Sequence, residues 1–284
     1  MPSGRKAFAM ASIFGDESAD GNAEVVFAVA GLVALDSQWD QTVDRWLQIT
    51  NGEDFHATDW QHHHGPESYE ELVQVIRSSG LYGWGVAIDL ASFRAEFPGL
   101  TQDYAYHKCF IEVADRLIKL SAEHGYKDLR FTFDGRQGQG TTGLLYDYIS
   151  SQNEWVDLLS FADGIAFDNR KNPRIQMADL LARETMRGCE HALRNATYRK
   201  SFVALASSDS RIQFDFLMGE YFSQWREGLR DLEKTTGIYA NEYWAWIKKQ
   251  NMQDNLNSRI KYLVWYEAKC LGQSGQDTRS MQDN

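Results

Sequence analysis

RIQMADLLAR, residues 174–183, is the stretch that decides the fold of this chain. It follows a proline and has the spacing of a helix, with Ile175, Ala178 and Ala182 on one face. Asp179 lies in the middle of that apolar face. A buried carboxylate needs a hydrogen bond, an ion pair or a metal ion, because burying a bare charge is costly. We therefore predict either a functional acid or a structural one that caps a neighbouring loop.

The composition limits the class of protein. With 284 residues, of which 43% are hydrophobic and 13% aromatic, the chain can bury a sizeable core, in one large domain or one domain with an appendage. Its formal net charge of −11 argues against a protein that coats nucleic acid, because such proteins have basic surfaces. An enzyme acting on nucleic acid is still compatible with this charge, because bound divalent cations can offset acidic groups.

The cysteines and the apolar segments favour a cytoplasmic protein. Cys109, Cys189 and Cys270 are scattered, and they form neither a disulfide framework nor the spacing of a zinc site. Such usage fits a reduced compartment. No apolar run is long enough to span a membrane, and residues 1–6 lack the features of a signal peptide. We therefore predict a cytoplasmic location and no membrane partner.

Two aspartates follow stretches with the pattern of β-strands. Residues 7–14 are apolar and lead to Asp16 in a polar turn, and residues 23–35 are a second apolar run, so the two are predicted to form a hairpin. Residues 128–134 alternate polar and apolar side chains and end at Asp134. Each aspartate is therefore expected at the carboxyl end of a strand, although Asp is also an ordinary turn former.

Strands and helices alternate after the opening hairpin. Helices are predicted over residues 36–49, 68–79, 101–124 and 141–152, and further strands over residues 81–89 and 155–167. Gly83 and Gly85 in one of these strands predict close packing or a bend. The order of elements predicts an α/β fold, with a mixed sheet flanked by helices. Sites in such sheets form at the carboxyl ends of strands, where Asp16 and Asp134 are expected.

The chain is predicted to divide into three parts. Residues 7–206 form the core domain, residues 207–272 form a helical appendage packed on the core, and residues 273–284 form a polar, disordered tail. The appendage is rich in Phe, Tyr and Trp. Aromatic stripes usually belong to a core or a subunit contact, so a homodimer is predicted, with stacking on bases as the less frequent use.

Three consecutive histidines, at residues 62–64, have only a superficial likeness to a metal site. Neighbouring side chains do not point in one direction, and no second cluster lies at ligand spacing, so an exposed loop is predicted. His56 and Asp59 flank a short aromatic segment and are the stronger candidates for a functional site.

Asp16, Asp134 and Asp179 are the candidate metal ligands. Clustered carboxylates repel one another unless a positive charge holds them together, and their hard oxygens select Mg²⁺ or Mn²⁺. Two such ions can orient a water molecule and stabilise the leaving oxygen of a phosphodiester. Whether the three side chains meet depends on the fold, because their spacing in the chain does not decide it.

Three segments, in this order, resemble the motifs of the DUF3800 family, whose name denotes a domain of unknown function. The opening motif is IFGDES at residues 13–18, and the middle motif is FHA at residues 55–57. The closing motif combines FDNR at residues 167–170 with IQMADLLA at residues 175–182. The resemblance covers about residues 8–190, and the closing motif is its most specific part.

The resemblance implies a ribonuclease-H-like fold and a metal-dependent nuclease. The metal-binding acids it implies are Asp16, Asp134 and Asp179. The secondary site residues it implies are His56, Asp168 and Gln176. Arg183 is assigned to substrate binding together with Asp168 and Gln176. The chain departs from the family at Ala19, where Gly is frequent, and at Asn169, where Ser is frequent, and neither departure removes a proposed ligand.

These observations predict a nuclease that hydrolyses phosphodiester bonds of DNA or RNA by a two-metal-ion mechanism. Asp16 would bridge the ions, while Asp134 and Asp179 would each complete one. His56 would move a proton or steady the scissile phosphate. Glu17 is a weaker catalytic candidate, because it points to the opposite side of an extended strand. The alternatives are a non-enzymatic binding protein with the same fold and a metal-dependent hydrolase of small nucleotides, which suits the acidic charge better.

Overall fold

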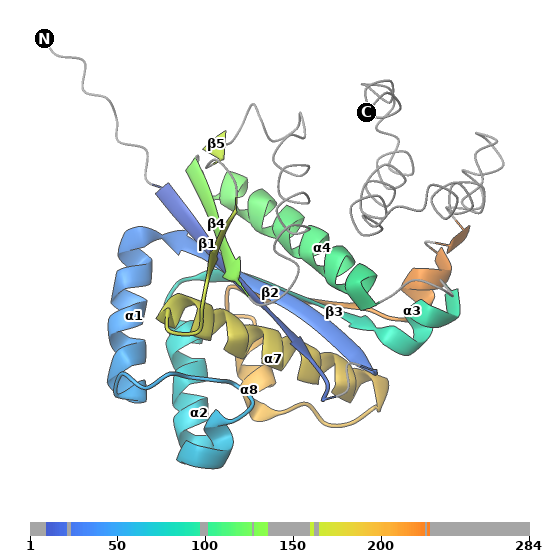
Figure 1. The fold of residues 1–284 in the computed structure, drawn as a ribbon, viewed down its shortest axis with the longest axis horizontal. Helices are drawn as coiled ribbons and strands as arrows, with labels where there is room; N and C mark the ends of the chain where they lie inside the picture. The colour runs from blue at the N-terminus through green and yellow to red at the C-terminus, as the bar shows by residue number, and fades with distance from the viewer. Residues whose placement is uncertain are drawn as a thin grey trace, which may run out of the picture. The chain divides into compact units, whose positions relative to one another are not determined.

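The computed structural model of the chain describes residues 10–21, 24–96, 102–126, 128–135, 160–161, 165–224 and 226–227. The chain forms two compact units, Met1–Met218 and Gly219–Asn284. The sheet, its helices and the candidate site all belong to the first unit (Figure 1).

A mixed sheet organises the first unit, and its described part has seven strands. The strands are β1 (Met10–Ala19), β2 (Val26–Leu35), β3 (Tyr82–Asp89), β4 (Asp128–Asp134), β5 (Ser160–Phe161), β6 (Ala166–Asp168) and β7 (Ile212–Leu217). Their order is β5-β4-β1-β2-β3-β7, and β6 pairs with β4. β1, β2 and β3 are antiparallel neighbours, whereas β4 runs parallel to β1 and β7 runs parallel to β3. The antiparallel start followed by parallel crossovers is the arrangement predicted from the sequence.

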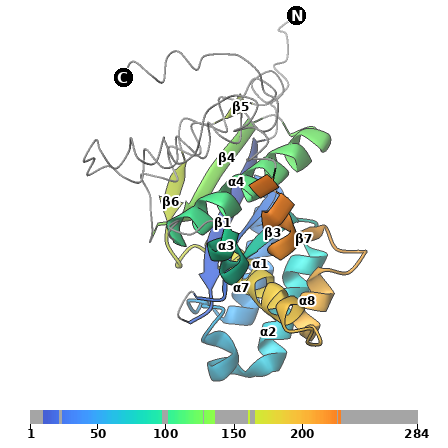
Figure 2. The ribbon, with the colours of Figure 1, turned by 90° about the vertical axis from the view of Figure 1, so that its right-hand side faces the viewer.

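Helices cover both faces of the sheet (Figures 1 and 2). They are α1 (Asp36–Thr50), α2 (Trp60–Ser78), α3 (Leu90–Glu96), α4 (Gln102–Glu123), α7 (Pro173–Leu193) and α8 (Lys200–Leu205). α4 packs on one face, against β2 and β3, and α7 packs on the other, against β1, β2 and β3. α1 lies beside α7 and also contacts β1 and β2, and α2 and α8 lie on the same side. Because both faces are covered, β2 is buried along nearly its whole length, which explains its continuous apolar sequence.

Close approach between α7 and the sheet depends on a glycine. A Cβ atom added to Gly85 of β3 would lie 2.0 Å from Oγ1 of Thr185 in α7. The helix therefore rests directly on the backbone of β3 at this point, as the glycine predicted. This contact fixes how deep α7 sits, and so where its side chains lie relative to the strands.

An aromatic cluster anchors α1 to the same face. Trp39 and Trp46 are fully buried, and burying a large apolar side chain contributes roughly 1.5–3 kcal/mol. The Trp39 indole N–H donates to the carbonyl of Ser12 at 2.9 Å, and that of Trp46 donates to Oε1 of Gln176 at 2.8 Å. The two tryptophans thus connect α1 to β1 and to the start of α7.

Two predicted elements differ from the structure. β1 continues past Asp16 to Ala19, because its hairpin pairing with β2 extends beyond its parallel pairing with β4. His62, His63 and His64 are exposed as predicted, but they lie in α2 and not in a loop. Gly65 has a φ of 83° and produces a kink inside that helix.

The predicted boundary between the core and the appendage also differs. Residues 207–218 were expected to be part of a helical appendage, but they contain β7, which pairs with β3. Buried Ile212 and Leu217 hold this strand in the sheet. The core therefore extends beyond residue 206 to Met218.

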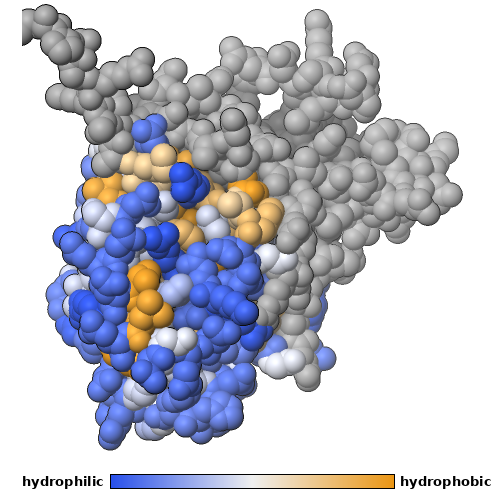
Figure 3. Space-filling view, turned by 60° about the vertical axis from the view of Figure 1, so that its left-hand side comes forward, coloured by the Kyte–Doolittle hydropathy of each residue, from blue (hydrophilic) through white to orange (hydrophobic). Residues whose placement is uncertain are grey.

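Several predictions fall outside the described residues. They are the helix over residues 141–152, most of the strand region over residues 155–167, most of the aromatic segment on which a homodimer was predicted, and the tail over residues 273–284. No helix in the described ranges is long and apolar enough to cross a membrane. The face drawn in Figure 3 is mostly hydrophilic over the described residues, with separate hydrophobic patches.

Candidate active site

Asp16 and Asp134 come from neighbouring parallel strands. Gly15 of β1 lies opposite Phe133 of β4, so the two aspartates follow one residue further along the same pair. The Phe133 ring packs against Phe110 of α4, with ring centroids 4.9 Å apart. Because successive side chains of a strand alternate between faces, Asp134 points to the other face, where α7 lies. Asp16 shares that face.

α7 supplies the third acid from the same side. The helix begins at Pro173, and the side chain of Asn172 caps it by accepting the Arg174 N–H at 2.9 Å. Asp179 follows in the second turn, with a side chain 13% exposed. The prediction that Asp179 lies in the middle of the apolar face was wrong. α7 is buried on almost all sides, so Asp179 occupies part of its narrow accessible stripe.

The segment before α2 holds Asp179 in place. Oδ2 of Asp179 accepts the backbone N–H of Ala57 at 3.0 Å and lies 3.0 Å from Nδ1 of His56. Nε2 of His56 lies 4.0 Å from Oδ2 of Asp59. His56 therefore stands between two carboxylates, and the interaction with Asp179 determines the orientation of its ring.

Backbone hydrogen bonds orient the two strand aspartates. Oδ1 of Asp16 accepts the N–H of Glu17 at 2.8 Å, and Oδ1 of Asp134 accepts the N–H of Gly135 at 3.0 Å. Asp16 is 7% exposed and Asp134 is 6% exposed. Both carboxylates are thus buried, with one oxygen directed by the chain that follows.

The electrostatics show that the acids influence one another. Burial raises the pKa of Asp16 well above its ordinary value, and the negative charges of Asp179, Glu17 and Asp134 raise it further. The hydrogen bond from the Glu17 N–H lowers this pKa and offsets only part of the increase. The fold therefore brings the three predicted acids into one electrostatic cluster, although they are far apart in the sequence.

The charge and the oxygen donors of the cluster suit a hard divalent cation, but the described side chains do not form a complete coordination site. Buried carboxylate oxygens that repel one another are the donors that Mg²⁺ and Mn²⁺ prefer. Yet among the described residues no three His, Cys, Asp or Glu side chains are gathered closely enough to hold one ion. The engagement of Asp179 Oδ2 by His56 and Ala57 explains part of this, because that oxygen is directed to the protein.

Asp168 lies beside the cluster and supports the loop that leads to α7. It is the register partner of Asp134 across β6 and β4. Its Oδ1 accepts the N–H of Asn169 at 2.8 Å, and its Oδ2 accepts the side-chain amide of Asn172 at 2.7 Å. Both oxygens are thus engaged in shaping the loop, and the assignment of Asp168 to substrate binding stays a prediction.

Gln176 has a similar supporting position. It is buried, its Oε1 accepts from Trp46, and its amide group donates to the carbonyl of Arg170 at 2.7 Å. These contacts tie α1 to the loop before α7, and substrate binding by Gln176 likewise stays a prediction. Glu17 faces away from α7, as expected from strand alternation, yet its charge still reaches Asp16.

Two contributors to the site were missed in the sequence. The N–H of Ala57 leaves no side-chain signal, because any residue except proline could provide it. Asn172 did leave a signal, because Asn followed by Pro is a typical start of a helix. The cap determines where α7 begins, and hence which turn contains Asp179.

The strand order, the strand directions and the helices on both faces define the architecture. This strand order and these directions are those of the ribonuclease-H-like fold that was predicted. No family model matches the chain, and no curated protein matches it.

Two solved structures are similar to this chain. A chain in the structure of the PCNA:RNase HII complex from Archaeoglobus fulgidus is similar over 81% of this chain and 91% of its own length, with a TM-score of 0.43 and 15% identity. Bst-RNase HIII in complex with Mn²⁺ is similar over 96% of this chain and 72% of its own length, with a TM-score of 0.42 and 11% identity. At this level of identity the similarity concerns the fold alone.

Proposed function

We propose that this chain is a metal-dependent nuclease of the DUF3800 family that hydrolyses phosphodiester bonds of DNA or RNA. One observation carries the proposal: β1, β4 and α7 direct Asp16, Asp134 and Asp179 to the same face of the sheet, where their charges act on one another. Such an arrangement is costly for folding alone, and clusters of perturbed acids favour a functional site.

The three acids would hold Mg²⁺ or Mn²⁺. When bound, the cation would neutralise the carboxylates, polarise the phosphodiester and lower the pKa of a water molecule. Asp16 is central, because both other acids raise its pKa. The hydrogen bonds from the Glu17 N–H and the Gly135 N–H orient the carboxylates of Asp16 and Asp134.

His56 is the proposed proton carrier. When Nδ1 holds a proton and donates it to Asp179, Nε2 carries the lone pair. Nε2 lies 4.0 Å from Oδ2 of Asp59 and is the atom at which His56 would take up or release a proton. Asp179 would then have two roles: it binds the cation and fixes the tautomer of the base.

A non-enzymatic binding protein with the same fold is the alternative. The observation in its favour is that no described trio of ligand side chains is already gathered around one point. In that case the acids would be structural, and a divalent cation would not stabilise the folded chain.

Thermal melting with and without millimolar Mn²⁺ separates the two functions. A cation that binds only the folded state raises the melting temperature, by about 5 °C or more at roughly 100 times its Kd. We expect this rise for the wild type and for Asp44→Asn, a control at an exposed acid on α1, and no rise for Asp179→Asn.

Cleavage assays on labelled DNA and RNA complete the test. The wild type and Asp44→Asn should cleave at least one polymer in Mn²⁺, and Asp179→Asn should lose at least about 100-fold in rate. Equal responses of all three proteins to Mn²⁺, without cleavage, would contradict the proposal and favour the binding protein.

A further inference from the structure

α7 has a single accessible stripe, and its residues carry charge. From Ile175 to Glu190, every residue of the helix is buried except Asp179, Arg183 and Arg187. These three are four positions apart, so they lie on one side of the helix at intervals of about 6 Å. The stripe therefore starts at an acid of the candidate site and continues as two arginines.

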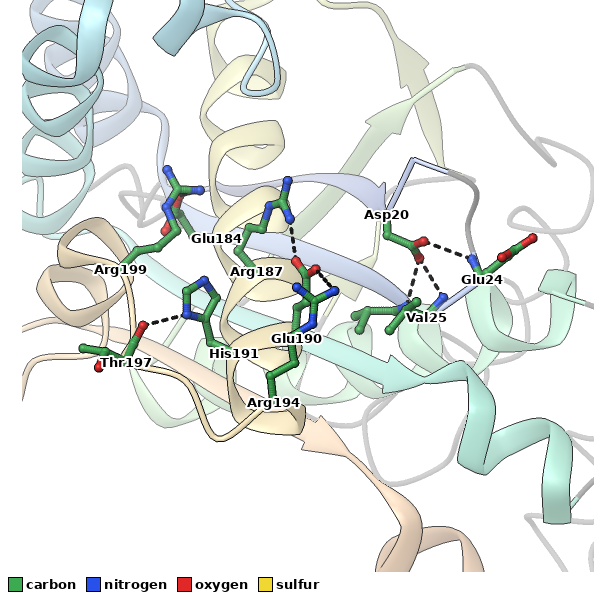
Figure 4. A network of polar contacts seen from close by, with 11 residues as sticks. Asp20, Glu24, Val25, Glu184, Arg187, Glu190, His191, Arg194, Thr197 and Arg199 are labelled. Carbon is green, nitrogen blue, oxygen red and sulfur yellow. Dashed lines mark hydrogen bonds and ion pairs between the residues drawn. The ribbon is translucent and has the colours of Figure 1, made fainter.

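The cations of the stripe belong to a larger basic group on an acidic protein. Arg187 and Arg194 both pair with Glu190, and Arg199 pairs with the buried Glu184 (Figure 4). With Arg183 included, four arginines meet two glutamates, which leaves a formal surplus of positive charge in a chain with a net charge of −11.

Arg183 lacks a partner within the described parts of the chain. No hydrogen bond or ion pair joins its guanidinium to a described residue, although the side chain is partly buried. Burial lowers its pKa, and the neighbouring charges of Arg187 and Arg199 lower it further, while Tyr69 and Glu184 offset only part of this decrease. A partly buried cation beside another cation is unfavourable by itself, and a bound anion would offset that cost.

The two ends of the stripe suit different parts of one ligand. The cluster around Asp179 suits a cation that holds the reacting phosphate, whereas Arg183 and Arg187 suit anionic oxygens one and two helical turns away. Guanidinium groups bind phosphate oxygens through paired, charge-assisted hydrogen bonds. A nucleoside monophosphate has one phosphate and cannot occupy both ends, but the phosphates of a strand recur along its length.

We infer that Arg183 and Arg187 bind backbone phosphates of a nucleic-acid strand that leads away from the carboxylate cluster. This inference rests on the proposed function, and it deepens it by specifying a polymer as the substrate and not a free nucleotide. Recognition of this kind depends on the phosphates and carries no base sequence.

The test measures binding of a fluorescein-labelled DNA or RNA 12-mer by anisotropy over a series of NaCl concentrations, in EDTA so that the strand is not cleaved. Arg183→Gln and Arg187→Gln should each weaken binding about 3- to 10-fold, and each should reduce the slope of log K against log [salt] by about one. Arg183→Lys keeps the charge and should recover the slope.

A matched control and a length series sharpen the result. Arg45→Gln removes the same charge from an exposed site on α1 and should bind like the wild type. The wild type should bind the 12-mer at least about 10-fold more tightly than a mononucleotide, and Arg183→Gln should lose most of that difference. Melting temperatures close to the wild type would exclude unfolding, with Arg187→Gln as the second variant if Arg183→Gln is unstable.

The outcomes distinguish this inference from the proposed function. Wild-type slopes for both glutamine variants, or equal affinity for the mononucleotide and the 12-mer, would overturn the role of the arginines. The Mn²⁺ response and the cleavage of the wild type would be unaffected by that result. Loss of the Mn²⁺ response together with absence of polymer binding would overturn both.

Discussion

At the scale of single residues, the ionisation of Asp16 links the stability of the fold to pH. Its folded-state pKa is raised above the ordinary value of 3.8 by burial and by Asp179, Glu17 and Asp134. Between the unfolded value and the raised folded value, the folded state binds more protons than the unfolded state. The free energy of unfolding therefore decreases as pH rises through this window. Asp16 is thus stabilising when protonated and destabilising when charged, unless a cation is bound.

Asp16→Asn should raise the stability of the metal-free protein at neutral pH. Asn keeps an oxygen that can accept the Glu17 N–H, and it removes the buried charge, so we expect a gain of about 1 kcal/mol in urea unfolding at pH 7.5 with EDTA. The gain should disappear near pH 4, where Asp16 of the folded wild type is protonated. A variant less stable than the wild type at pH 7.5 would show that the charge of Asp16 is compensated within the protein. In Mn²⁺ the order should reverse, because only the wild type binds the ion.

At the scale of elements, α7 both packs in the core and carries a residue of the candidate site. Its cap at Asn172 fixes the start of the helix, and Gly85 fixes its depth on the sheet. Its buried sides hold the core together, and the accessible stripe that begins at Asp179 is the only part left for function between Ile175 and Glu190. A change in how α7 packs should therefore reach the site without altering any site residue.

Gly85→Ala tests this coupling. The added methyl group would lie 2.0 Å from Oγ1 of Thr185, so α7 must shift or the side chain must move, at a cost of about 1–3 kcal/mol. We expect lower stability in urea and a smaller rise of the melting temperature with Mn²⁺, because Asp179 moves with the helix. Gly21→Ala is the matched control, since a Cβ there meets no atom within 4 Å. An unchanged Mn²⁺ response in a destabilised Gly85→Ala would argue that α7 does not position the ligand.

At the scale of the whole molecule, the sheet decides where the core ends. β7 pairs with β3, whose edge would otherwise present unpaired backbone groups. β7 follows α8 in the chain, after the segment that resembles DUF3800. The structural core is therefore longer than the segment with recognisable motifs.

A chain ending at Ala206 should be less stable and aggregate more than one ending at Met218. The shorter chain lacks β7 and exposes the edge of β3, so we expect a lower melting temperature and more aggregate in size-exclusion chromatography. The longer chain keeps the strand and serves as the control. Equal melting temperatures and equal aggregation would mean that β7 contributes little to the core and that the predicted boundary at residue 206 is adequate.

The sequence by itself determined the alternation of strands and helices and predicted Asp16 and Asp134 at the ends of strands. The parallel pairing of β1 and β4, which brings these two residues side by side, came from the structure. The spacing of apolar residues and the positions of glycine and proline affect the local backbone, so helices, strands and turns can be predicted from short segments of sequence. The strand of residues 212–217 escaped recognition, because its aromatic residues fit either a helix or a strand until a partner edge is available.

Only the tertiary structure decided which side of α7 stays accessible. Its apolar spacing predicted one buried face containing Asp179, whereas the sheet, α1, α2 and α8 together bury nearly all of it. Burial of a helix face depends on elements that are distant in the chain, and the spacing of apolar residues within the helix does not predict them. For the same reason the charge interactions of Asp16, Asp134 and Asp179, and the line of Arg183 and Arg187 beyond them, exist only in the folded molecule.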